Sequence, residues 1–137
     1  MSPVLKSRSR WIEGFRSALD NGRKHSVVVD LPENLGGTDL GATALELAVM
    51  ALAGCITTIF SIVAKKMRLE FESLEAIVEA EKGEVTIEKC TVTLKVKTKA
   101  PRETVERAWK ITWKNCPVGA LFEKAGVEVK HEIEIIS

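Results

Sequence analysis

The chain has 137 residues, which is long enough to bury a sizeable core, and we expect a single domain over residues 1–137. Its 20 basic and 19 acidic residues give a net charge of +1, which excludes the strongly basic surface that binds nucleic acid or an anionic membrane. An apolar fraction of 45% and a charged fraction of 28% are typical of a soluble globular protein.

The cysteines indicate a reducing compartment. There are three of them, Cys55, Cys90 and Cys116, and an odd, scattered set does not fit a disulfide framework. The first residues lack the apolar stretch of about 7–15 residues that a signal peptide needs. We therefore expect a cytoplasmic protein, in which a functional disulfide would be transient.

The first third of the chain predicts a small antiparallel sheet followed by a loop. Residues 10–22 have the pattern of strand, tight turn and strand, and residues 25–31 form a third strand rich in β-branched side chains. Residues 32–41 contain a proline and three glycines, so we expect a flexible loop. The loop lacks the lysine of a phosphate-binding loop.

A long helix is predicted over residues 43–67. Thr43 and Glu46 have the S/T-x-x-E spacing of a capping box, and Lys65 and Lys66 lie where the helix dipole favours cations. The helix is therefore well defined at both ends.

This helix carries no charged residue from Leu47 to Ala64, which is the length at which a membrane span must be considered. Its glycine, cysteine and threonines at positions 54–58, and the amphipathic segments on both sides, favour a central helix covered by protein instead. One small domain cannot easily cover a helix on all sides, so the pattern also suggests a second chain.

The remaining segments complete an α+β domain. Residues 73–82 and 85–98 alternate as a hairpin around a two-residue turn, and Cys90 falls on the apolar, core-facing side of the second strand. Residues 101–115 form an amphipathic helix in which Trp109 and Trp113 share the packed face. A short helix over residues 116–126, with Pro117 in its first turn, and a strand over residues 127–136 follow. The predicted order is β-β-β-α-β-β-α-α-β.

Neither metal nor cofactor binding is predicted. His25, His131 and the cysteines lack the spacing of metal ligands, and both histidines fall in or beside predicted strands, where we expect structural roles. No Walker or dinucleotide-binding glycine pattern occurs.

Cys55 and Cys116 remain as candidate nucleophiles, whose thiolate forms are the reactive ones. Cys116 is expected where a helix begins, so unpaired backbone N–H groups there can stabilise an anion. Cys55 has the same help only if Gly54 breaks the long helix. Taken singly, each cysteine is more often an inert core residue.

Two motifs around these cysteines resemble those of the OsmC/Ohr family (osmotically inducible protein C and organic hydroperoxide resistance protein). LELAVMALAGCIT, at residues 45–57, is similar to the family's E-L-x-x-x-A-x-A-G-C helix, and NCPVGALF, at residues 115–122, is similar to its C-P-V-x-x-x-L element. The predicted order of elements also fits over nearly the whole chain. GATALEL lacks the N-P-E element of the hydroperoxide-resistance branch, which indicates a more divergent OsmC-like subgroup.

The resemblance implies an intertwined homodimer with active sites at the interface and two-cysteine thiol peroxidase chemistry. Cys55 would be the peroxidatic thiolate, and Cys116 would resolve its sulfenic acid to a disulfide. An external dithiol reductant would then restore both thiols. Apolar surroundings suit an organic hydroperoxide substrate better than hydrogen peroxide.

The family also uses an arginine near the N-terminal hairpin and a glutamate on the cysteine helix. Arg16 matches the arginine, whose guanidinium would favour a thiolate and polarise the peroxide; the alternative is an exposed turn residue. Glu46 lies about two and a half turns before Cys55, so the two face opposite sides of a straight helix. The hydroperoxide-resistance branch has its glutamate where this chain has Leu45. This geometry favours a Glu46 that caps the helix or orients Arg16. The family resemblance leaves a catalytic role for Glu46 as the alternative.

The sequence as a whole predicts a dimeric, cytoplasmic α+β thiol peroxidase that binds neither nucleic acid nor membrane. The alternatives are a non-enzymatic module of the same fold that senses oxidation or binds an apolar ligand, and a structural or membrane-anchored domain with inert cysteines. Whether Cys55 and Cys116 can bond depends on their separation, because a Cα distance well above about 7 Å would require backbone movement.

Overall fold

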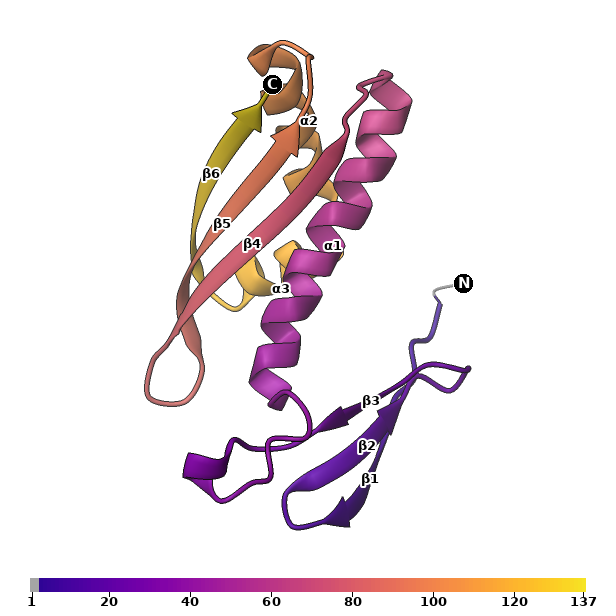
Figure 1. Ribbon diagram of the computed structural model, residues 1–137, viewed down its shortest axis with the longest axis vertical. Helices are drawn as coiled ribbons and strands as arrows, with labels where there is room; N and C mark the ends of the chain where they lie inside the picture. Colours follow the sequence, from indigo (N-terminus) through magenta and orange to yellow (C-terminus); the bar gives the residue numbers. More distant parts are fainter. Residues whose placement is uncertain (1–2) are drawn as a thin grey trace. The chain divides into compact units, whose positions relative to one another are not determined.

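The computed structural model describes residues 3–137 and contains two three-stranded sheets, three α-helices and a short 3-10 helix (Figure 1). The helices and strands follow the predicted α+β order. Backbone contacts divide the chain into two compact units, one ending at Ala48 and one beginning at Val49. A single domain over the whole chain stays a prediction.

The first unit is built on the antiparallel sheet β1-β2-β3, whose strands are Arg8–Glu13, Arg16–Asp20 and Ser26–Val29. Gly14, with a φ of +55°, forms the turn after which β2 begins. The loop predicted to be flexible contains the 3-10 helix η1 (Glu33–Leu35). Backbone N–H groups of this loop donate to the carboxylate of Asp30, so the loop has a defined structure instead.

Helix α1 (Ala44–Met67) begins as predicted. The N–H of Glu46 donates to the hydroxyl of Thr43 (3.0 Å), and the N–H of Thr43 donates to the carboxylate of Glu46 (2.9 Å). Lys65 and Lys66 lie in the last turn. The helix runs unbroken through Gly54, which excludes the predicted alternative of a break beside Cys55.

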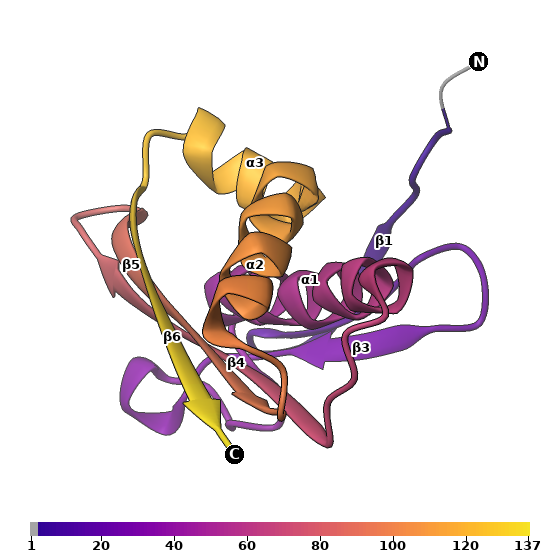
Figure 2. The same cartoon turned by 90° about the horizontal axis from the view of Figure 1, so that it is seen from above.

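The second unit contains the sheet β4-β5-β6, formed by Ser73–Lys82, Ile87–Lys97 and Glu128–Ile136. Strands β4 and β5 form the predicted hairpin, but β5 begins at Ile87 rather than at residue 85, so the turn is longer than two residues. Helices α2 (Arg102–Asn115) and α3 (Pro117–Lys124) connect β5 to β6, which lets β6 pair with β5 in parallel. In Figures 1 and 2, α2 and the part of α1 after Ala48 lie on the same face of this sheet.

The core of the second unit lies between this sheet and the helices. Cys90 and the β5 valines and leucine on its face are buried, as predicted. α1 contributes five buried residues: Leu52, Ile56, Phe60, Val63 and Ala64. α2 contributes Val105, Ala108, Trp109 and Thr112. The helices that carry Cys55 and Cys116 are therefore held together by the same core.

Candidate active site

Two free cysteines from different helices meet in the second unit. Cys55 lies in the middle of α1, and Cys116 is the residue between α2 and α3. Their Sγ atoms are 3.1 Å apart, with the S–H of Cys116 donating to the Sγ of Cys55. A disulfide bond measures about 2 Å, so a shift of about 1 Å would bring the sulfurs to bonding distance.

The two thiols have different surroundings. Cys55 is half-buried, whereas Cys116 is 1% exposed. Burial and, after it, the hydrogen bond to Cys55 together raise the pKa of Cys116 to about 11, against the opposite effect of the backbone N–H of Gly119. Cys116 is therefore held as a protonated donor, and Cys55 is the acceptor of the pair.

The position of Cys116 follows from its local sequence. It is the N-cap residue of α3, with Pro117 at the first helical position, as predicted. Its Sγ accepts a hydrogen bond from the N–H of Gly119 (3.3 Å) in place of the usual side-chain oxygen. A Cβ at Gly119 would lie 2.9 Å from the Cζ3 atom of Trp113, so the close approach of the two helices requires glycine here.

Arg16 begins β2 in the first unit, and its side chain is 18% exposed. One of its terminal nitrogens donates to the carboxylate of Glu13 (2.7 Å) and the other to the hydroxyl of Thr38 (3.0 Å). That hydroxyl in turn donates to Asp30. Arg16 is therefore held by a defined network, not left free in an exposed turn.

Asp30 is the buried acid of this network. The hydrogen bond from the Thr38 hydroxyl, with smaller contributions from backbone N–H groups, lowers the pKa of Asp30 from its ordinary value of 3.8 to about 2, against the opposite effect of burial. A carboxylate at this position therefore holds the hydroxyl that contacts Arg16.

Of the four predicted site residues, the structure brings together Cys55 and Cys116. The contacts of Arg16 and Glu46 are with residues of the first unit, and those of Glu46 are with Thr43 at the start of α1. Capping by Glu46 is confirmed. Its catalytic role and that of Arg16 stay predictions.

No group of three metal-binding side chains occurs within residues 3–137. His131 packs edge-on against Trp113 and Trp109, with ring centroids 4.6 and 5.4 Å away, and burial lowers its pKa. His25 contacts Asn21 through its Nδ1. His131 is therefore part of the packing around Trp113, whereas the role of the exposed His25 stays a prediction.

An apolar groove of about 370 Å³ lies between α1 and α2, and its lining includes neighbours of both cysteines but neither cysteine itself. Ile59, one turn after Cys55, and Asn115, directly before Cys116, both line it. Ile62, Met67 and Ile111 continue its wall away from the cysteines, and Lys66 supplies a charged edge.

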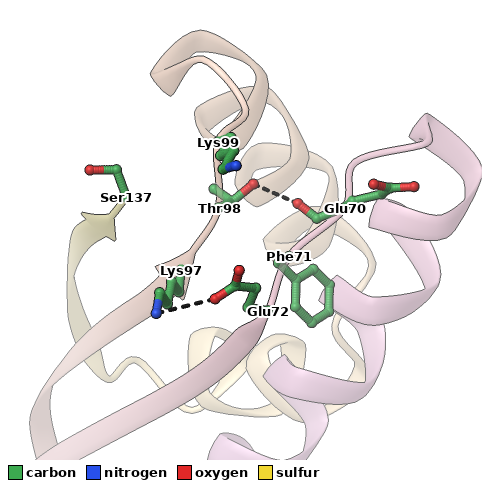
Figure 3. A pocket seen from close by; sticks show the side chains of 7 residues that line it. All are labelled: Glu70, Phe71, Glu72, Lys97, Thr98, Lys99 and Ser137. Atoms are coloured by element: carbon green, nitrogen blue, oxygen red, sulfur yellow. Dashed lines mark hydrogen bonds and ion pairs between the residues drawn. The ribbon is translucent and has the colours of Figure 1, made fainter.

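A second cavity of about 300 Å³ lies beyond the C-terminal end of α1 (Figure 3). The figure shows Lys97 paired with Glu72 and the Thr98 hydroxyl donating to the Glu70 backbone oxygen. Met67, the last residue of α1, is about 18 Å along the helix axis from Cys55. This cavity is therefore not part of the cysteine site.

Gly119, Asp30 and Thr38 were not identified from the sequence as members of these networks. Gly119 follows an N-cap cysteine by three positions, which is the position where a cap receives its hydrogen bond, so the capping pattern contained that signal. Asp30 and Thr38 have no comparable signal, because their contact joins a strand end to a residue eight positions later.

Comparisons with known proteins identify the family and the fold of the chain. A family model described as OsmC-like protein matches residues 37–132. No curated protein matches the chain. Among solved structures, an OsmC-like protein from Mycoplasma pneumoniae is similar with a TM-score of 0.90 at 11% identity, with both chains covered in full. The organic hydroperoxide resistance protein OhrB of Bacillus subtilis gives a TM-score of 0.65 at 22% identity, covering 96% of this chain and 98% of the other.

A third structure, an organic hydroperoxide resistance protein from Elizabethkingia anophelis, has a TM-score of 0.75 at 17% identity and 98% coverage of both chains. At these identities the likeness shows the fold, which is the predicted OsmC-like α+β fold.

Proposed function

Because this chain belongs to the family of OsmC-like proteins, we propose that it is a thiol peroxidase that reduces organic hydroperoxides to alcohols. The observation that carries the proposal is the contact between the sulfurs of Cys55 and Cys116. Structural neighbours named organic hydroperoxide resistance proteins support the substrate class.

The first step is assigned to Cys55. Its thiolate attacks the terminal oxygen of the hydroperoxide, the O–O bond breaks, and the leaving alkoxide takes up a proton to become the alcohol. Cys55 is left as a sulfenic acid. The half-buried position of Cys55 supports this role, because a substrate must reach the attacking sulfur.

The second step is assigned to Cys116. Its sulfur attacks the sulfur of Cys55, the S–O bond breaks, and the departing hydroxide is protonated to water. An external dithiol then supplies two electrons and two protons and restores both thiols. Resolution within the chain protects Cys55 from irreversible overoxidation.

The apolar groove between α1 and α2 supports an organic substrate. Its side chains near Cys55 are aliphatic, so the hydrocarbon part of a hydroperoxide would lose contact with water on binding there. Hydrogen peroxide has no such part and gains nothing from the groove.

Arg16 is proposed to polarise the peroxide and to favour the thiolate of Cys55. Its hydrogen bonds to Glu13 and Thr38 hold the guanidinium in one orientation, which supports a positioned catalytic group. Glu46 caps α1, and a Glu46→Gln variant would separate this role from any further part in catalysis.

We further propose a cytoplasmic homodimer with the active sites at its interface. Asp30 is the only fully buried residue within residues 3–48, and Trp11 and Phe15 are exposed there, so this segment has little core of its own. α1 also exposes apolar side chains such as Met50 and Ile62. A second chain would cover such surfaces.

The experiment that tests the function is stopped-flow oxidation of the reduced protein by cumene hydroperoxide. We expect Cys55→Ser to abolish peroxide consumption and Cys116→Ser to leave one round of oxidation without a disulfide. Cys90→Ala is the matched control and should keep turnover, because Cys90 lies in the core of β5.

Peroxide consumption by Cys55→Ser at the wild-type rate would contradict the peroxidase. Rapid oxidation of the wild type by one equivalent, with no turnover in the presence of any dithiol, would instead favour a redox sensor that uses the same sulfur pair.

A further inference from the structure

Near Cys116, the side chain of Trp113 contacts both Gly119 and Glu123, and we call these three residues the α2–α3 clamp. The indole N–H of Trp113 donates to a carboxylate oxygen of Glu123 at 2.6 Å. This bond ties the last turns of α2 and α3 to each other. Gly119 packs against the same indole so closely that a Cβ would lie 2.9 Å from Cζ3 and 3.1 Å from Cη2.

The clamp ends at the sulfur of Cys116. The N–H of Gly119 donates to that Sγ at 3.3 Å, and the N–H of Cys116 donates to the backbone oxygen of Trp113 at 3.3 Å. The indole is also held from β6, where the ring of His131 meets it edge-on at a centroid distance of 4.6 Å. The first turn of α3 is therefore fixed relative to α2 by contacts on several sides.

We propose that Trp113 and Glu123 are positioning residues for the resolving step, because they hold α3 so that the N–H of Gly119 points at the sulfur of Cys116. The proposal rests on the proposed peroxidase function, in which this sulfur forms the S–S bond as the S–O bond of Cys55 breaks and hydroxide leaves. An N–H donor aimed at Sγ stabilises the thiolate that makes the attack.

The thiolate of Cys116 depends on the N–H of Gly119 because few other hydrogen-bond donors reach its sulfur. The groups that act on its pKa are burial and the thiol of Cys55, which raise it, and the backbone N–H groups of Gly119 and Val118, which lower it. Among the described residues, the effects that lower its pKa come from these backbone groups and not from a cationic side chain. Misalignment of the Gly119 N–H therefore removes one of the two interactions that favour the anion.

The test measures the thiolate of Cys116 directly. In a Cys55→Ser/Cys90→Ala background Cys116 is the only thiol, and the chain contains no tyrosine whose ionisation would overlap the ultraviolet absorbance of a thiolate. Glu123→Leu removes the acceptor of the indole N–H, and Gly119→Ala places a methyl group against the indole. We expect each to raise the pKa of Cys116 by about one unit.

Two variants serve as controls. Glu123→Gln keeps an acceptor oxygen and should restore the wild-type titration. Lys124→Leu changes the adjacent exposed position of α3 and should have no effect. With Cys55 and Cys116 intact, Glu123→Leu should slow disulfide formation about tenfold after a pulse of cumene hydroperoxide, with the rate of the first oxidation unchanged.

An unchanged pKa of Cys116 in folded Glu123→Leu and Gly119→Ala proteins would overturn the proposal. An effect of Glu123→Gln as large as that of Glu123→Leu would overturn it too, because the hydrogen bond would then not be the cause. The titration uses no peroxide. Absence of peroxide consumption in every protein, the wild type included, would therefore count against the peroxidase function alone.

Discussion

At the scale of single residues, the two sulfurs in contact have unequal environments, and this asymmetry supports unequal roles. Cys116 is enclosed, protonated and directed at Cys55, whereas Cys55 accepts its hydrogen bond and remains partly accessible. A group that must meet a substrate needs access, and a group that only meets its neighbour does not.

Arg16 provides a test at this scale. We expect Arg16→Ala to slow the oxidation of Cys55 by cumene hydroperoxide at least about tenfold, because a positioned cation no longer stabilises the developing charge. Arg16→Lys keeps the charge but cannot donate to Glu13 and Thr38 from two nitrogens of one planar group. Its oxidation rate should therefore fall between those of the wild type and Arg16→Ala.

Arg8→Ala is the matched control for that measurement, because Arg8 is an exposed arginine of the neighbouring strand that pairs with Asp20. A rate for Arg16→Ala equal to that of Arg8→Ala would exclude a catalytic role for Arg16.

Asp30 predicts a dependence of stability on pH. Its pKa is lowered from 3.8 to about 2 in the folded chain, chiefly by the hydroxyl of Thr38, so the fold favours the carboxylate. The stabilisation is complete above about pH 4 and is lost as the pH falls towards 2. Melting temperatures across this range should fall more steeply for the wild type than for Asp30→Asn, which has no carboxylate to protonate. Parallel curves would show that Asp30 does not contribute.

At the scale of elements, two separate parts of the α1 sequence determine where the helix begins and where it places Cys55. Its first turn is fixed by the capping box, and its middle carries Cys55 without a break at Gly54. A Cβ at Gly54 would meet nothing within 4 Å, so no close packing inside the chain explains the glycine. The small residue instead leaves the face of α1 beside Cys55 open.

The cap itself can be separated from catalysis. Glutamine also serves at the third position of a capping box, so Glu46→Gln should keep both thermal stability and peroxidase rate, while Glu46→Ala should lose about 1 kcal/mol of stability. Denaturant unfolding and steady-state assays measure the two effects. A large loss of rate in a stable Glu46→Gln protein would assign the carboxylate to the reaction.

The groove between α1 and α2 predicts a change in substrate preference. Ile62 lines it and is 47% exposed, so Ile62→Gln should fold normally while making the groove polar. We expect the KM for cumene hydroperoxide to rise about fivefold or more, with little change for hydrogen peroxide. Leu121→Gln, at an exposed position of α3 outside the groove, is the control. Equal effects on both peroxides would show that the groove does not bind the substrate.

The elements themselves were largely predictable, because their signals are local. Thr43 and Glu46 mark one helix start, Pro117 another, and alternation around Cys90 shows which face of β5 is buried. The parallel pairing of β6 with β5 was not predicted, since it depends on where two intervening helices return the chain. The contact of Cys55 with Cys116 joins residues 61 positions apart, so it was expected only through the family resemblance.

At the scale of the whole molecule, the exposed face of α1 is the feature that a single chain leaves unexplained. Among the described residues α1 is the one helix long and apolar enough to cross a membrane, and 28% of its most apolar stretch is buried within the chain. The core helix of a soluble assembly has the same composition as a membrane span. The two alternatives differ in what they predict: a membrane-spanning helix requires detergent, whereas a helix covered by a second chain gives a dimer that is soluble without it.

A dimer predicts that a charge on this face separates the chains. Thr58 lies on the exposed side of α1, one turn after Gly54, and Thr58→Glu would place an unpaired carboxylate in the interface. We expect the dissociation constant from sedimentation to rise about a hundredfold or more, with detergent-free solubility retained. Leu121→Glu, at an exposed position of α3, is the control. A monomeric wild type, or one soluble only in detergent, would contradict the dimer.

The 61-residue separation of the two sulfurs has a thermodynamic consequence. A bond between them would close most of the second unit into one covalent loop and restrict its unfolded chain, which corresponds to about 4 kcal/mol of added stability. Oxidation would thus be coupled to folding: the cross-linked form should resist heat and proteolysis better than the dithiol form. By the same linkage, the external reductant must overcome the preference of the native fold for the closed loop. The melting temperature would then distinguish the disulfide form of the protein from the dithiol form.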